Sequence, residues 1–275
     1  MRDPSVSVII PTFNRREFVL EAVRSVLEQT FEPLELIVVD DGSTDGTADA
    51  LRGLGDRRLR VIEQKNRGVS AARNAGVAVS RAPLVAFLDS DDLWLPQKLQ
   101  VQTAYMDANP DISICQTEEL WLRRGRRVNP KSKHRKRSGW IFEDCLPLCI
   151  VSPSATMMRR LAFDALGGFD EGLLACEDYD LWLRASLRYQ ISTLSEPLIV
   201  KRGGRPDQLS AQWGLDMHRI AALEKIMEDP LLSEERRRLV LAEIKRRSRI
   251  VSAGARKRLN TALSRDYASK ADLLG

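Results

Sequence analysis

Continuously apolar runs alternate with polar turns over the first 110 residues. The runs that indicate strands occupy 5–12, 34–41, 59–64 and 83–89. Each is followed by a stretch with apolar residues at helical spacing, for instance Phe18, Ala22 and Val26 after the first run. Alternation of strand and helix predicts a parallel sheet with right-handed crossovers, and therefore an α/β fold.

Polar segments follow all four predicted strands: "PTFNR", "DDGS", "KNRG" and "DSDD". In α/β sheets ligands bind at the carboxyl ends of the strands, so we expect these loops to meet at one rim. Asn14 and Glu17 resemble the capping pair of the helix after the first strand. The rim is thus the predicted binding site.

The stretch "VAFLDSDDLW" places Asp89, Asp91 and Asp92 within four residues at the end of a predicted strand. Neighbouring carboxylates at a partly desolvated position repel one another. A divalent cation that bridges carboxylates to a diphosphate would offset that repulsion, since hard cations use one or two carboxylates plus phosphate oxygens. We expect Asp92 to face the following helix.

The second half of the chain is less regular. Residues 111–210 hold short strand-like pieces and a helical "EDYDLWLR", and 214–265 indicate amphipathic helices. We expect a ligand-binding half at 1–110, a second half of the same domain at 111–210, and a helical extension at 211–275.

The charge and the residue composition limit the kinds of partner that we expect for this protein. The net charge is +5, and residues 123–137 form a basic run with no acid, which favours an anionic partner and peripheral membrane contact through this run. The run lacks the interleaved aromatics that stack bases, so nucleic acid is not favoured. Four scattered cysteines indicate neither a zinc site nor a disulfide framework. The apolar runs are too short for a membrane span or a signal peptide, so we expect a cytoplasmic protein.

Other nucleotide-binding signatures are missing. No GxGxxG follows the first strand, and there is no P-loop. The Gly-rich basic loop of nucleotidyltransferases is also missing from "PTFNRREF".

Five motifs in register, "VSVIIPTFNR", "LIVVDDGSTDGT", "NRGVSAARNAG", "FLDSDDLW" and "CEDYDLWLR", resemble the inverting family 2 glycosyltransferases of GT-A fold over about residues 5–200. The resemblance implies transfer of a sugar from a nucleoside diphosphate sugar, with a UDP-sugar favoured, to a hydroxyl of a cell-surface glycan, glycolipid or similar acceptor. It also implies Mn²⁺ or Mg²⁺ as cofactor and a role in polysaccharide biosynthesis. An anionic or lipid-linked acceptor fits the basic run.

The resemblance assigns a role to each matching position. Asp91 is the expected metal ligand of the DxD motif, and Asp89 would reach the ribose or a metal-bound water. Asp178 stands where the family keeps its general base, with Glu177 beside it. The implied nucleotide-binding residues are Pro11, Thr12, Phe13, Asn14, Asp40, Asp41, Asn66, Gly68, Arg73 and Ser90.

One position departs from the family pattern. Many relatives supply a further metal or phosphate ligand, often His, from the loop that corresponds to residues 200–210, and this stretch has no His. Lys201 or Arg205 could contact the diphosphate directly as cations. The alternative to an enzyme is therefore a non-catalytic nucleotide-sugar-binding or scaffold protein on the same fold.

Overall fold

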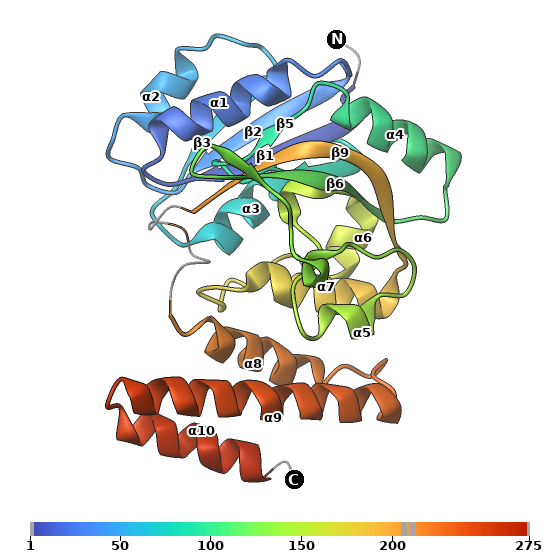
Figure 1. Ribbon diagram of the computed structural model, residues 1–275. Helices are drawn as coiled ribbons and strands as arrows, with labels where there is room; N and C mark the ends of the chain where they lie inside the picture. The colour runs from blue at the N-terminus through green and yellow to red at the C-terminus, as the bar shows by residue number, and fades with distance from the viewer. Residues whose placement is uncertain (1–2, 205–207, 209–212, 274–275) are drawn as a thin grey trace.

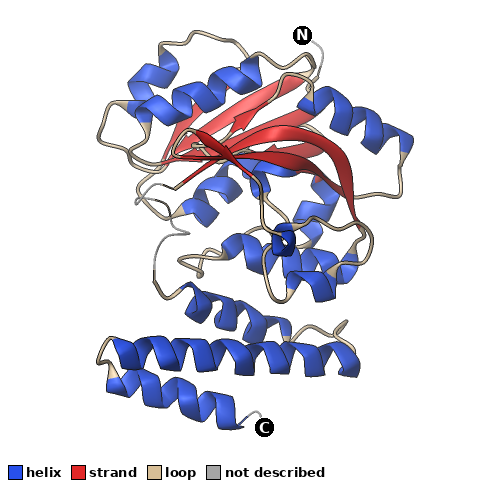
Figure 2. Ribbon diagram, viewed as in Figure 1, coloured by secondary structure: helices blue, strands red, loops and turns tan. Residues whose placement is uncertain are grey.

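The computed structural model describes residues 3–204, 208 and 213–273. Its centre is a curled, nine-stranded mixed sheet with helices on both faces (Figures 1 and 2). The strand order is β3-β2-β1-β4-β8-β6-β9-β5, with β7 paired to β6. The α/β prediction is confirmed.

The parallel half of the sheet comes from the first strands of the chain. These are β1 (Val6–Thr12), β2 (Leu34–Asp40), β3 (Leu59–Glu63) and β4 (Leu84–Phe87). They agree with the four predicted runs to within two residues at each end. Their alternate residues bury on opposite faces: Ile9 packs in one core, and Val8 and Ile10 pack in the other. A strand buried on both faces is continuously apolar, which explains the sequence pattern.

Helices α1 (Arg16–Leu27), α2 (Thr47–Arg52) and α4 (Lys98–Ala108) cover one face, and α3 (Val69–Ala78) lies on the other (Figure 1). A Cβ at Gly76 of α3 would come within 2.5 Å of Ile9, so glycine allows this helix to approach β1 closely. The contact fixes α3, and with it Arg73, beneath the rim.

The second half of the sheet mixes directions. Strand β8 (Thr156–Arg159) lies antiparallel between β4 and β6 (Ile114–Arg123), and β9 (Ile191–Gly203) runs parallel to β6. The two-residue β5 (Leu93–Trp94) pairs antiparallel with β9 at the far edge. The loop of the DSDD motif is therefore held by strand pairing on both sides. The remaining strand, β7 (Arg126–Val128), forms a hairpin with β6.

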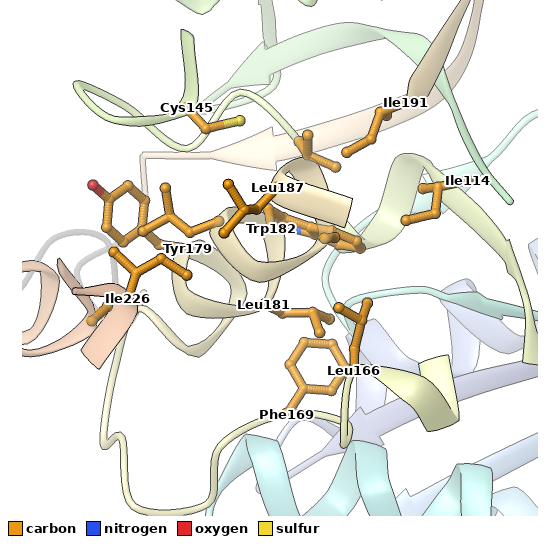
Figure 3. Packing of buried hydrophobic residues seen from close by; sticks show 14 of the residues in the cluster. Ile114, Cys145, Leu166, Phe169, Tyr179, Leu181, Trp182, Leu187, Ile191 and Ile226 are labelled. Carbon is orange, nitrogen blue, oxygen red and sulfur yellow. The ribbon is translucent and has the colours of Figure 1, made fainter. Parts of the chain in front are cut away.

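Helix α7 (Glu177–Arg188) lies at the centre of the hydrophobic core on the face of the sheet that α3 covers. Tyr179, Leu181 and Trp182 are each at most 1% exposed, and they pack among residues from several elements (Figure 3). The short helices nearby are η1 (Ser132–His134), α5 (Phe142–Cys145), η2 (Pro153–Ala155) and α6 (Arg160–Ala165).

The C-terminal extension consists of α8 (Leu215–Ile226), α9 (Glu234–Lys257) and α10 (Thr261–Leu273), stacked beyond α7 (Figure 1). Ser233 caps α9 by accepting a hydrogen bond from the backbone N–H of Arg236 at 3.3 Å. Arg247 of α9 is 2% exposed and donates to the carbonyl oxygens of Leu146 and Pro147 at 3.1 and 2.9 Å. The extension is thus joined to the sheet domain through buried contacts.

Within residues 3–204, 208 and 213–273, no helix has the length and apolarity that crossing a membrane requires.

Candidate functional site

Asp41 organises the rim at the end of β2. It is 4% exposed, and its carboxylate accepts hydrogen bonds from Gln64 Nε2 (2.7 Å) and from the backbone N–H groups of Arg67 (2.9 Å) and Gly68 (2.8 Å). Gly68 has φ of +89°, a conformation that glycine adopts without strain. Asp41 therefore ties the loop before α3, which includes the exposed Asn66, to the end of β2.

The loops after β1 and β2 are also bonded to each other. The backbone N–H of Asn14 donates to Ser43 Oγ, and that of Thr44 donates to Asn14 Oδ1, both at 2.8 Å. Asp40 accepts from the N–H of Ser43 at 2.8 Å. Phe13 lies on this rim with 45% of its surface exposed. The predicted capping pair is wrong, because α1 begins at Arg16 and the Asn14 side chain serves the neighbouring loop.

At the end of β1, Pro11 pairs with Val39 and Thr12 with Asp40 in the sheet. Thr12 is 3% exposed, and its Oγ1 has no hydrogen-bond partner among the described residues. A buried hydroxyl without a partner is unusual and suits contact with a bound ligand.

Each aspartate of the DSDD loop has its own partners. Asp89 accepts from Arg73 at 2.7 Å, and Asp91 accepts from Arg15 at 3.0 Å and from Gln208 at 3.2 Å. Ser90, between them, is 6% exposed.

Asp92 has its hydrogen-bond partners on segments distant in the sequence. Its carboxylate accepts from Ser154 Oγ at 2.8 Å and from the backbone N–H of Arg202 at 3.0 Å. The sequence analysis did not predict these partners, one of which comes from β9, some 110 residues later. Because the two segments are so far apart in the sequence, nothing in the sequence indicates that Asp92 and β9 are neighbours.

The crowded carboxylates ionise unequally. Burial would raise the pKa of Asp89, but Arg73 and Lys201 outweigh burial and hold this pKa below its usual range. Burial dominates at Asp92, and together with the charges of Asp89 and Asp91 it raises the pKa of Asp92 to about 7 against the effect of Lys201. One carboxylate thus stays ionised while another retains its proton to near neutrality.

Arg73 joins the rim to α7. Its guanidinium donates to Asp89 at 2.7 Å and to Glu177 at 2.6 Å, and lies 4.9 Å from the ring centroid of Phe169. Burial of Glu177 raises its pKa, and the opposing effect of Arg73 does not cancel this. The contact brings together the DSDD and CEDYD motifs, which are far apart in the sequence.

Asp178 is partly buried at the start of α7, two residues after Cys176, whose φ of +61° forms the turn into the helix. The Cys149 thiol lies 3.5 Å from Asp178 Oδ2 in donor geometry, and the N–H of Tyr179 donates to Oδ1 at 2.7 Å. Burial, reinforced by the charge of Asp178, raises the pKa of Cys149 well above its ordinary value, so the thiol keeps its proton. The carboxylate is held in place yet keeps some exposure.

Lys201 is the cation between the two acidic motifs. Its Nζ donates to Ser152 Oγ at 3.0 Å. Burial would lower its pKa, but nearby carboxylates raise it well above the usual value; in order of effect these are Glu119, Asp92, Asp89 and Asp178. Arg205, the other predicted diphosphate contact, lies outside the described residues.

Several residues near the site were not predicted. Gln208 reaches Asp91 from the loop in which a His was sought, and Arg15 reaches it from the PTFNRR segment. A glutamine or arginine in a polar loop gives no sequence signal for such a contact.

The basic run of residues 123–137 is held near its C-terminal end by a buried ion pair. Lys136 and Glu119 form an ion pair at 3.2 Å with both side chains 5% exposed. Burial would raise the pKa of Glu119, but Lys201 and Lys136 together lower it to about 2. His134 packs edge-to-face against Trp121, with 5.0 Å between the ring centroids.

The carboxylates at the rim suit one kind of metal binding. The described part of the chain contains no cluster of three His, Cys, Asp or Glu side chains that could enclose an ion. Asp91 and Asp89 instead fit a mode in which one or two protein carboxylates and the phosphates of a ligand share a hard cation.

Comparisons with known proteins show which sequences and folds the chain resembles. The family model described as "Glycosyl transferase family 2" matches residues 7–167. An uncharacterized glycosyltransferase of Rickettsia bellii is 33% identical over 205 residues, which are 72% of this chain and 29% of that protein. The chain spans about a third of the length of the first such relatives.

Two solved structures resemble the fold. S. aureus TarS 1–349 in complex with UDP-GlcNAc superimposes with a TM-score of 0.71 at 18% identity, covering 96% of this chain and 90% of that one. The mannosyltransferase PcManGT from Pyrobaculum calidifontis, in complex with GDP-Man and Mn²⁺, gives a TM-score of 0.64 at 18% identity, covering 99% and 87%.

Proposed function

We propose a reaction for this chain, which belongs to glycosyl transferase family 2: transfer of a sugar from a nucleoside diphosphate sugar to an acceptor hydroxyl, with inversion at the anomeric carbon. The observation that carries the proposal is the bridge from Arg73 to both Asp89 and Glu177. It links a candidate diphosphate site to a segment that bears a candidate base.

The donor would bind to the half formed by residues 1–110. Pro11, Thr12 and Phe13 would line the nucleoside slot, and Asp41 would accept from the base edge. The unpaired Thr12 Oγ1 supports this assignment. The related folds bind UDP-GlcNAc and GDP-Man, and a UDP-sugar is the donor that we expect here.

Mn²⁺ or Mg²⁺ would be held by Asp91, with Asp89 beside it, and would neutralise charge on the leaving diphosphate when bound. Lys201 would also help to neutralise the charge of the leaving diphosphate, because its ammonium group lies among the site carboxylates. Lys201 would attract the diphosphate, and Arg205 would add to this charge.

The acceptor would approach from the half formed by residues 111–210. Its hydroxyl oxygen bonds to the anomeric carbon as the bond from that carbon to the diphosphate oxygen breaks, and the electron pair leaves with the diphosphate. Asp178 takes the hydroxyl proton, while the Tyr179 N–H donates to its carboxylate and helps to hold it in position. Attack opposite the leaving group inverts the configuration.

The variant Asp178→Asn tests the proposal. With a panel of nucleotide sugars and Mn²⁺, we expect sugar transfer to fall by about 10² to 10⁴, the usual range for losing a general base. Donor-induced thermal stabilisation should stay unchanged, because Asp178 does not bind the nucleotide. Asp164→Asn, on the exposed side of α6, is the matched control. Turnover equal to wild type in Asp178→Asn would remove Asp178 as the base, and a lack of turnover with every donor would favour the non-catalytic alternative.

A further inference from the structure

A groove separates the start of α8 from the last third of α9. Its volume is about 640 Å³, within the range of small-molecule and sugar sites. The residues that the argument uses are Trp213, Asp216, Arg219, Ile250, Lys257 and Arg258, all of which line the groove.

The groove adjoins the segment that carries the candidate base. The Cys176 thiol lies 3.7 Å from the carbonyl oxygen of Leu215, which lines the groove, and Cys176 directly precedes the Glu177–Asp178 pair. An acceptor whose hydroxyl reaches Asp178 must extend over neighbouring surface. The groove is one such surface, on the α7 side of the site.

The lining carries excess positive charge. Arg219, Lys257 and Arg258 face one acid, Asp216, which already pairs with both Arg219 and Arg247. Lys257 and Arg258 are exposed at the end of α9. Cations that are not neutralised within the groove favour an anionic ligand.

The wall of the groove also has apolar surface. Trp213 is 47% exposed and Ile250 45% exposed, and the guanidinium of Arg258 lies 4.7 Å from the ring of Trp213. An indole presents a broad amphipathic face, on which a sugar ring can pack. A carboxylate or phosphate on that ring would then lie near Arg258 and Lys257.

We propose that this groove is an acceptor subsite and that the acceptor is an anionic glycan, with its charge on carboxylate or phosphate groups. The proposal rests on the function given above, because it places the acceptor on the side of Asp178. Trp213 would hold a sugar ring one or more units from the reacting hydroxyl, and Lys257 and Arg258 would hold its charge.

Calorimetry with three probes tests the subsite: pentagalacturonate, phosphorylated maltopentaose and neutral maltopentaose. We expect at least one anionic probe to bind about tenfold more tightly than the neutral one, and the preferred anionic probe identifies the charged group. Lys257→Glu/Arg258→Glu and Trp213→Ala should each weaken that binding by about tenfold. Both variants should keep the thermal stabilisation given by the nucleotide sugar.

The matched control is Arg249→Glu/Arg256→Glu, which makes the same charge change at exposed α9 positions outside the groove lining. Its affinity for the anionic probe should stay within about twofold of wild type. An equal loss in the control and groove variants would overturn the proposal in favour of general attraction by α9. Tighter binding of single-stranded DNA, or a groove variant that only splits a dimer, would overturn it as well.

Failure of the two proposals can be distinguished. If wild type transfers sugar but the groove variants bind anionic probes normally and keep the acceptor KM, the subsite is wrong and the enzyme assignment stands. If no nucleotide sugar is bound or turned over, the proposed function itself fails.

Discussion

Two buried arginines flank the start of α7, one from the rim and one from the C-terminal extension. Arg73 is 3% exposed and binds Glu177, and Arg247 is 2% exposed and lies 5.6 Å from the ring of Tyr179. Asp178 stands between these two contacts in the sequence. The same residue type thus holds one helix end from two sides.

The carboxylate partners of the two arginines differ in whether another cation stays beside them when the arginine is removed. Glu177 has Arg73 as the cation that the structure pairs with it. The two carboxylates at Arg247 keep other cations, since Asp216 also pairs with Arg219 and Glu243 with Arg246. Arg73 therefore neutralises a buried Glu177 for which the described residues show no second ion pair, whereas Arg247 shares its two carboxylates with other cations and also donates to backbone carbonyls.

The largest expected effect follows from Arg73→Met. The substitution leaves the buried Glu177 without its guanidinium and takes one cation from the partly exposed Asp89, and breaking a buried ion pair from one side costs about 3–5 kcal/mol. Urea denaturation should show this loss in the free energy of unfolding. Arg67→Met, in the loop before α3, is the control, because its pair with Glu171 is on the surface and contributes about 1 kcal/mol or less. Equal losses in the two variants would contradict the distinction.

Arg247→Met should cost less, about 2–3 kcal/mol, because the Leu146 and Pro147 carbonyls lose charged donors while both carboxylates keep partners. The same denaturation series measures it. A loss as large as that of Arg73→Met would show that the second partners do not compensate. Arg236→Met, which breaks an exposed contact of α9 with Glu143, is the control within the extension.

Lys98 extends the comparison to a buried cation that contacts uncharged groups: its Nζ donates to Gln102 Oε1 at 2.5 Å and lies 3.8 Å from the centroid of the Trp94 ring. Burial lowers its pKa from 10.5 to about 7. Between these values the unfolded chain holds a proton that the folded chain has released, so raising the pH stabilises the fold.

The contribution of Lys98 should be about 2 kcal/mol between pH 7 and pH 9. In Lys98→Met this part of the pH dependence should disappear, as judged by the free energy of unfolding at several pH values. The exposed Lys65→Met should keep the wild-type slope. A wild-type slope in Lys98→Met would assign the effect to another group.

The rim was predictable because its strands and loops are local in sequence. Strands buried on both faces are apolar throughout, and the polar loop after each strand has to lie at its carboxyl end. The positions of β1 to β4 and of Asp41, Asp89 and Asp91 follow from these two facts. The two-residue β5 has no such pattern and was missed.

The contacts that could not be predicted depend on partners distant in the chain. Lys136 lies in a basic run that has the composition of a solvated surface, yet Glu119 draws it into a buried pair. Arg247 lies in a helix rich in arginine, and the sequence does not mark the one that is buried. Asn14 had the spacing of a helix cap, but Thr44 competes for its side chain. The spacing of residues within one segment cannot show which distant donor or acceptor forms the hydrogen bond or ion pair.

The pairing of β5 with β9 also sets an order of assembly. Leu93 pairs with Val200 and Trp94 with Ile199, and the N–H of Leu95 donates to the carbonyl oxygen of Leu198 at 2.9 Å. During synthesis the strands β1 to β4 emerge long before β9, and contacts between distant residues form late. The nascent N-terminal half would therefore carry an incomplete DSDD loop, and its aspartates would reach their final positions only after the ribosome has released residue 200.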